Sequence, residues 1–306
     1  MHNPLLDRFP GVIGFPVTPF TREGEFDGNG FGGNVEFLLG SGLAALAFCG
    51  SNGELQSITL DEYRAVAETA SGMVSGKKGL LFGVGQTLRT AQEQARLARR
   101  AGADAVIIMA PYMADENEAG LADYYRRVAE TAEIPAVLYQ TKWSGVLPLS
   151  LLDRLQDVEN ICMVKDENGN LSHYLNVRQR YGDRFFWVNG MAEPFVPSYW
   201  NLGVTTSTSG LACFMPQVTD EIFQCAAAGD FGRVNQLLDE IVVPLYQIRN
   251  RKPGYKCSMI KTAMNLAGLA GGFVRSPLIE LSPDDRNDLE GILARTGLLN
   301  AQQVPA

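Results

Sequence analysis

The stretch ICMVKDENG (Ile161–Gly169) places a lysine directly behind four apolar residues and in front of an Asp-Glu-Asn-Gly turn signal. An ammonium group is costly to bury, so a lysine at the end of an apolar run needs a physical reason. The run is continuously apolar rather than alternating, which is typical of a strand buried on both faces of a parallel sheet. A chain that repeats this pattern is expected to build an all-parallel sheet.

The pattern occurs eight times along the chain. The runs are GVIGFPV (Gly11–Val17), LAALAFCG (Leu43–Gly50), LLFGVG (Leu80–Gly85), AVIIMAP (Ala105–Pro111), PAVLYQ (Pro135–Gln140), ICMVKD (Ile161–Asp166), FFWVNG (Phe185–Gly190) and VTTSTSG (Val204–Gly210). Segments with helical periodicity lie between them, and one opens with Thr59 and Glu62 at the positions of a capping box. Eight strands with crossovers predict an α/β fold, a (β/α)8 TIM barrel. A doubly wound sheet is the alternative, but the dinucleotide fingerprint it often carries is absent.

The chain of 306 residues is long enough for one such barrel and a further element. Beyond the eighth run the pattern is wholly helical, from QVTDEIFQ (residues 217–224) to ILARTGLL (residues 292–299). That is more helix than one βα unit requires. We therefore expect a barrel domain over residues 1–225 and a C-terminal helical extension over residues 226–306, packed on the barrel.

Composition and charge exclude several classes of function. The net charge is −8, and the most basic run, RNRK (Arg249–Lys252), is too short for a nucleic-acid groove. The five cysteines are widely spaced without a CxxC pair, which indicates a reducing compartment. The start MHNPLLDRFPG has no signal-peptide pattern, and no apolar run reaches the roughly 20 residues that span a bilayer. We expect a cytoplasmic protein with neither a nucleic-acid nor a membrane partner.

Metal and nucleotide sites are not expected either. The two histidines, His2 and His173, share no metal-ligand spacing. The glycine-containing segment GVGQTLRT (residues 83–90) lacks the lysine of a phosphate loop.

In a (β/α)8 barrel the active site lies at the C-terminal ends of the strands, which directs attention to Lys165. An amine among apolar side chains loses hydration of its charged form, so its pKa falls and free amine becomes available to attack a ketone. The alternative is a lysine that extends to the strand edge and pairs with Asp166 or Glu167. Position alone does not decide between the two.

Other strand ends carry further candidates, each with an ordinary alternative. CGSNGE (Cys49–Glu54) could bind a carboxylate through its backbone N–H groups, or be a plain βα turn. Tyr139 could shuttle protons, or be a core aromatic with its hydroxyl at the rim. Ser207, Thr208 and Ser209 could bind a polar substrate, or bond to the neighbouring backbone.

Taken together, these residues resemble a known superfamily. FPVTPF (Phe15–Phe20), the GSNGE turn, a tyrosine closing the fifth run and a lysine closing the sixth are similar to the Schiff-base-forming barrels of the dihydrodipicolinate synthase and N-acetylneuraminate lyase superfamily. The resemblance implies that Lys165 and Tyr139 are catalytic. It also implies that the turn at Ser51, Asn52 and Gly53 holds the α-carboxylate of a 2-oxo acid.

Within the superfamily the chain most resembles the 5-dehydro-4-deoxyglucarate dehydratases. The similarity lies in three stretches and in the pair Tyr139-Gln140; the stretches are NGMAEPFVPSYWNLGVTTSTSGLACFMP (residues 189–216), RNRKPGYKCSMIKTA (residues 249–263) and GFVRSPLIELSP (residues 272–283). The segment TKWSG (Thr141–Gly145) lacks the arginine of the synthases, and Met113 stands where they have a second tyrosine. Both departures argue against dihydrodipicolinate synthesis.

The resemblance implies a reaction and its requirements. Lys165 would form an imine with the substrate ketone, water and carbon dioxide would leave, and 2,5-dioxopentanoate would be released without any cofactor or metal. Asn189, Gly190, Thr208 and Ser209 are the candidates for holding the hydroxyls and distal carboxylate of this small sugar acid. A homotetramer is implied as well. Two alternatives remain: an aldolase or synthase that releases or uses pyruvate, and a non-catalytic barrel that binds a 2-oxo acid.

Overall fold

The computed structural model describes residues 11–112 and 117–300. The first ten residues, with His2 and most of the stretch used to judge export, lie outside the described residues, and so does Met113. No helix within the described ranges is both long and apolar enough to cross a membrane.

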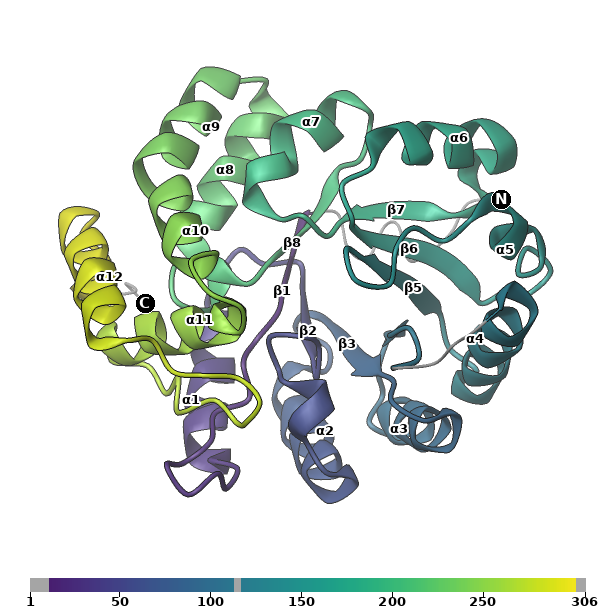
Figure 1. Ribbon diagram of the computed structural model, residues 1–306, viewed down its shortest axis with the longest axis horizontal. Coiled ribbons are helices and arrows are strands. Elements are labelled where there is room, and N and C mark those ends of the chain that lie inside the picture. The colour runs from purple at the N-terminus through teal and green to yellow at the C-terminus, as the bar shows by residue number, and fades with distance from the viewer. Residues whose placement is uncertain (1–10, 113–116, 301–306) are drawn as a thin grey trace.

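Eight parallel strands close into a barrel in sequence order, β1 to β8, which confirms the predicted (β/α)8 fold (Figure 1). Each strand falls within or largely overlaps its predicted run. Their bounds are β1 Gly11–Gly14, β2 Ala45–Phe48, β3 Gly79–Val84, β4 Ala105–Ile108, β5 Ala136–Thr141, β6 Ile161–Glu167, β7 Phe186–Asn189 and β8 Thr206–Ser209. Closure pairs β1 with β8 and leaves no free sheet edge.

Helices follow the strands and surround the barrel (Figure 1). They are α1 Gly28–Leu39, α2 Leu60–Val74, α3 Leu88–Arg100, α4 Glu118–Ala132, α5 Leu149–Asp153, α6 Leu171–Tyr181, α7 Val196–Asn201 and α8 Pro216–Ala228. The predicted capping box is present at the start of α2, where Thr59 accepts from the Glu62 backbone N–H and Glu62 accepts from the Thr59 backbone N–H. Both first-turn donors are thereby satisfied, and the helix starts where the sequence predicts.

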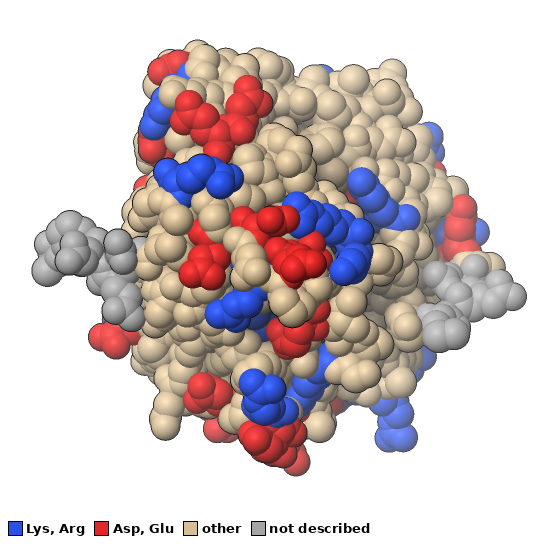
Figure 2. Space-filling view, turned by 60° about the vertical axis from the view of Figure 1, so that its left-hand side comes forward, with Lys and Arg blue, Asp and Glu red and all other residues tan. Residues whose placement is uncertain are grey.

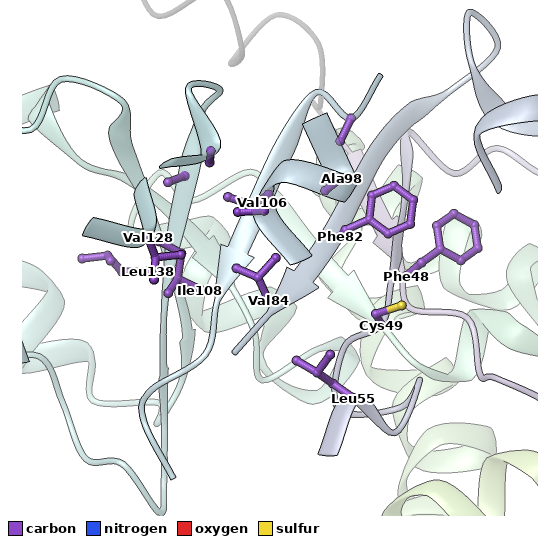
Figure 3. Close-up of a cluster of buried hydrophobic side chains, with 14 of the residues drawn as sticks. Phe48, Cys49, Leu55, Phe82, Val84, Ala98, Val106, Ile108, Val128 and Leu138 are labelled. Carbon is purple, nitrogen blue, oxygen red and sulfur yellow. The ribbon is translucent and has the colours of Figure 1, made fainter. Parts of the chain in front are cut away.

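Alternate side chains of each strand serve two separate cores. Phe48, Phe82 and Val106 point outward and meet helix residues such as Ala98 and Val128 (Figure 3). The intervening residues point inward, where a smaller cluster includes Ala47, Leu81, Ile107, Val137 and Tyr139. Burial on both faces explains why the runs are continuously apolar. These inward-facing residues include Tyr139, near the C-terminal end of β5.

The C-terminal part of the chain adds a helical unit with its own core. Helices α9 Phe231–Leu237, α10 Val243–Arg249, α11 Tyr255–Leu266 and α12 Pro283–Arg295 lie together on one side of the barrel, at the left in Figure 1, with a π-helical turn joining α9 to α10. Val242, Leu245, Met259, Ile260 and Leu293 are buried in a hydrophobic cluster shared with α8. The predicted boundary at residue 225 falls inside α8. The division into barrel and extension remains a prediction.

The face of the molecule in Figure 2 carries acidic and basic side chains interspersed with each other. Several charged residues of the molecule form ion pairs near the surface, such as Arg126–Asp157 and Arg180–Asp153. Such surface pairs contribute little to stability, at most about 1 kcal/mol each.

Candidate active site

Lys165 and Tyr139 are brought together by strand pairing. The register of β5 against β6 sets their Cα atoms opposite each other, and in parallel strands partners in register share a face. The Lys165 Nζ lies 3.8 Å from the centroid of the Tyr139 ring and 4.4 Å from that of Phe15. The two residues therefore meet inside the barrel, at the C-terminal ends of their strands.

The Lys165 amine is buried, with the residue only 4% exposed. Burial lowers the pKa of Lys165 to about 8; the Glu167 carboxylate opposes this effect, while Lys256 and Arg249 reinforce it. At pH 7 about a tenth of this amine is therefore uncharged, far more than for an ordinary lysine, and the free amine is the form that attacks a carbonyl. The ordinary alternative, a lysine extended into solvent, does not describe this side chain, although its pairing with Glu167 is present.

Glu167 is also part of this site, although the sequence alone indicates no catalytic role for it. Strand β6 continues to Glu167 rather than turning after Asp166, so the residue two positions beyond Lys165 points the same way. Its Oε2 accepts a hydrogen bond from the Tyr139 hydroxyl and lies 3.5 Å from Lys165 Nζ. Its Oε1 accepts from Lys256. The two-residue spacing was the signal that could have identified it.

Asp166, between the two, points to the other face and holds the strand end in place. It accepts hydrogen bonds from the Gln140 side chain, the Tyr199 hydroxyl and the backbone N–H groups of Asn168 and Gly169. A carboxylate with this many donors is fully engaged. Asp166 therefore orders the turn that follows Lys165.

The site opens into a cavity of about 1320 Å³ at the C-terminal end of the barrel. Besides Lys165 and Glu167, its charged lining residues are Lys142, Arg249 and Lys256. Four cations thus share the described lining with one carboxylate, and an anionic ligand fits this balance better than a cationic one. Arg249 and Lys256 come from α10 and α11, so the C-terminal extension supplies half of these cations.

The turn after β2 forms another wall of the cavity, through Ser51 and Asn52. Asn52 donates to the Phe15 carbonyl oxygen at 3.4 Å, while its Oδ1 has no hydrogen-bond partner in the part of the chain that the structure describes. The Gly53 carbonyl oxygen stabilises the turn, because it accepts a hydrogen bond from the Thr18 hydroxyl at 2.8 Å. Gly83 on β3 makes room for the turn, because a Cβ there would lie 2.1 Å from the Cys49 carbonyl oxygen.

The whole chain was compared with known proteins. The model of the dihydrodipicolinate synthetase family matches residues 8–296. The chain belongs to this family. A probable 5-dehydro-4-deoxyglucarate dehydratase from Bacillus licheniformis is 32% identical over 92% of each chain. One of the same description from Azotobacter vinelandii is 32% identical over 94% of this chain and 95% of its own.

Solved structures of the dihydrodipicolinate synthetase family share the fold. Dihydrodipicolinate synthase from Oceanobacillus iheyensis superposes with a TM-score of 0.89 at 27% identity, covering 96% of this chain and 98% of its own. YagE, a prophage protein of the dihydrodipicolinic acid synthase family from E. coli K12, was solved in complex with pyruvate. It superposes with a TM-score of 0.85 at 25% identity, covering 95% of this chain and 99% of its own. The resemblance inferred from the sequence is confirmed.

The remaining predicted contacts of this family member fall into two groups. Gly190 and Thr208 line the cavity. Asn189 and Ser209 are engaged in the surrounding structure: the Asn189 amide donates to Ala192 and to the Ser207 hydroxyl, and Ser209 donates to the buried Glu193. Their contact with a substrate remains a prediction.

Arg249 and Lys256 were missed as lining residues because they lie in a segment that reads as a helical extension. Their approach to the barrel depends on how α10 and α11 pack, which strand periodicity does not report.

Two aromatic residues at the cavity, Tyr112 and Trp143, are also unusually exposed, at 73% and 62%. Met113, whose identity argued against dihydrodipicolinate synthesis, lies outside the described residues.

Proposed function

We propose that the protein is a decarboxylating dehydratase that converts 5-dehydro-4-deoxyglucarate to 2,5-dioxopentanoate, carbon dioxide and water through a Schiff base on Lys165. The observation that carries the proposal is the buried amine of Lys165, lodged against the Tyr139 ring and held beside Glu167. The names of the relatives at about 32% identity support the choice of substrate.

The first step is imine formation. The free amine of Lys165 attacks the C5 ketone; the adduct takes up one proton and loses water, which gives an iminium that remains covalently attached. Burial that lowers the pKa of the amine to about 8 makes this attack possible near neutral pH. Ser51 and Asn52 line the same cavity, and we assign them to the neighbouring carboxylate.

The iminium then acts as an electron sink for two bond cleavages. Removal of a C4 proton gives an enamine, whose electrons expel the C3 hydroxyl as water. The conjugated iminium accepts the electron pair of the C1–C2 bond as C1 leaves as carbon dioxide. Hydrolysis releases 2,5-dioxopentanoate and restores Lys165. The lysine supplies the electron sink, so the scheme requires no further cofactor.

The charges around the cavity support a substrate with two carboxylates. Lys142, Arg249 and Lys256 add three cations, and Glu167 already neutralises part of the charge of Lys256. A guanidinium is suited to bind a carboxylate through two parallel hydrogen bonds. We assign Arg249 to the distal carboxylate, and Thr208 and Gly190 to the hydroxyl-bearing part of the substrate, with Asn189 and Ser209 supporting that wall.

The resemblance also supports a homotetramer that acts in the cytoplasm on sugar diacids such as those of glucarate catabolism. Light scattering of the purified protein tests the assembly: a mass near four times 33.3 kDa is expected, and a monomer at working concentration contradicts it.

Product identification tests the reaction. Purified enzyme is incubated with 5-dehydro-4-deoxyglucarate and with hydroxylated 2-oxo acids of five and six carbons, and the products are separated by mass. The proposal expects 2,5-dioxopentanoate and one equivalent of carbon dioxide. Release of pyruvate instead identifies C3–C4 cleavage and an aldolase. Absence of any product with every acid contradicts catalysis on this class of substrate.

A further inference from the structure

Tyr139 alone cannot remove a proton from the substrate. Burial raises the pKa of Tyr139 well above its usual range and the Glu167 carboxylate raises it further, so the phenol is protonated at neutral pH. A protonated phenol accepts a second hydrogen only if it gives up its own. The recipient must already be hydrogen-bonded to the phenol, and Glu167 Oε2 is the carboxylate oxygen that occupies this position.

Glu167 is ionised and ready to accept. Burial raises the pKa of Glu167, but Lys256 and Lys165 lower it more strongly, to about 2. The charged and titratable groups that face it come from four elements: Tyr139 on β5, Lys165 on β6, Tyr246 on α10 and Lys256 on α11. Arg249, also on α10, acts electrostatically on Lys165 and Tyr139. The carboxylate therefore lies between a phenol that can donate a proton and cations that stabilise its charge.

We propose that Glu167 is the proton acceptor behind Tyr139. As the phenol oxygen takes the hydrogen from the carbon next to the imine, the phenol's own hydrogen moves to Glu167 Oε2. The C–H electron pair becomes the C=C bond of the enamine, and the C=N π pair becomes a lone pair on nitrogen. The proton later returns through Tyr139 to the departing C3 hydroxyl, which leaves as water and restores both groups. The inference rests on the proposed function for its imine.

Glu167 becomes more basic during the same step in which it accepts the proton. Formation of the enamine removes the positive charge on the Lys165 nitrogen, which lies 3.5 Å from Glu167 Oε2 in the free enzyme. That charge is one of the two that keep the carboxylate weakly basic, so its loss favours protonation of Glu167. Glu167 acts on the substrate through Tyr139 and is therefore a positioning and proton-relay residue.

The test separates proton removal from imine formation and from dehydration. The probe is 2-oxoadipate, which has the carbon chain and both carboxylates of the proposed substrate but no hydroxyl to eliminate. In D₂O, enzyme that forms the enamine exchanges the hydrogens next to the ketone, and proton NMR follows their loss. Borohydride trapping of the same mixture measures the imine independently.

In Glu167→Gln the amide keeps the size and an acceptor for Tyr139 but cannot take a proton. We expect trapping within about threefold of the unchanged enzyme and exchange slowed about 100-fold or more, the usual contribution of a positioned base. Because Glu167 acts through Tyr139, adding Glu167→Gln to Tyr139→Phe is expected to slow exchange no further.

Three results overturn the inference alone: exchange by Glu167→Gln close to that of the unchanged enzyme, loss of trapping together with exchange, or additive effects of the two substitutions. An unchanged enzyme that neither traps nor exchanges 2-oxoadipate contradicts the imine itself. In that case the proposed function fails together with the inference.

Discussion

Two buried lysines in this molecule face a glutamate, and they differ in how completely their charges are satisfied. Lys261 on α11 lies 2.5 Å from Glu54, and both side chains are fully buried. Its Nζ also donates to the Phe273 carbonyl oxygen at 2.6 Å, and Glu54 accepts from the Arg275 backbone N–H at 3.0 Å. This pair ties the turn after β2 to the C-terminal extension.

Lys165 has a weaker set of partners. Its nitrogen is 3.5 Å from Glu167 and otherwise faces the rings of Phe15 and Tyr139, at the wall of a cavity. Glu167 divides its interactions among Tyr139, Lys165 and Lys256. Burial alone therefore does not distinguish the two lysines. Lys165 differs from Lys261 in having an incompletely satisfied amine with access to a ligand, as the proposed reaction requires.

The largest expected effect is on turnover. Replacing Lys165 by alanine removes the nucleophile, so activity should fall about 10⁴-fold or more while the protein stays folded. Steady-state assays and a thermal unfolding curve measure the two properties on the same sample. Residual activity within about tenfold of the unchanged enzyme contradicts a covalent role for Lys165.

The matched substitution at the other lysine should act on stability. Lys261→Met leaves the Glu54 charge buried without its cation, which costs about 3–5 kcal/mol in the free energy of unfolding. Denaturant titration measures this loss. Adding Glu54→Gln removes the unpaired buried charge and should restore part of the lost stability. A single variant as stable as the unchanged protein shows that the Lys261–Glu54 pair does not hold the turn.

The charge of the C-terminal extension should govern substrate selectivity. Arg249→Gln is expected to raise the KM for a dicarboxylate about tenfold, the loss of one charge-assisted contact, with kcat less affected. Pyruvate, which has no distal carboxylate, serves as the control probe, and its trapping at Lys165 should change little. Equal loss for both acids argues against a distal-carboxylate role for Arg249.

The smallest expected effect is a shift in pH dependence. Free amine accumulates as pH rises toward the Lys165 pKa of about 8, so the rate of trapping should rise with pH and level off above that value. The Glu167 carboxylate raises this pKa and Lys256 lowers it. Glu167→Gln should therefore move the midpoint down and Lys256→Met should move it up, each by about one pH unit. Shifts in the opposite directions contradict the electrostatic account.

The barrel could be predicted because its strands are buried on both faces, so that all of them except the hydroxyl-rich β8 read as largely apolar runs. The same reasoning predicts where the candidate site lies, because parallel strands of a closed barrel all end at the same mouth of the barrel. Lys165 and Tyr139 follow from this logic, because each closes an apolar run. Glu167 was reachable in principle, but DENG reads as a turn, and the strand continues one residue further than that signal suggests.

Other features depend on packing between distant segments. Arg249 and Lys256 lie on helices whose placement is set by a second hydrophobic cluster rather than by any local pattern. Ser209 donates to Glu193, and Glu54 pairs with Lys261. Both contacts join residues from different elements of the fold. A sequence motif shows that such residues are polar, but not whether their partner is a ligand or another side chain.

The most direct test of the account is the site of covalent attachment. Enzyme is reduced with borohydride in the presence of 5-dehydro-4-deoxyglucarate or 2-oxoadipate, digested, and its peptides are mapped by mass spectrometry. The account predicts one reduced adduct on Lys165 and none on Lys142, Lys256 or Lys261. Full turnover of the substrate with Lys165 unmodified after reduction, or an adduct carried by Lys256 instead, contradicts it.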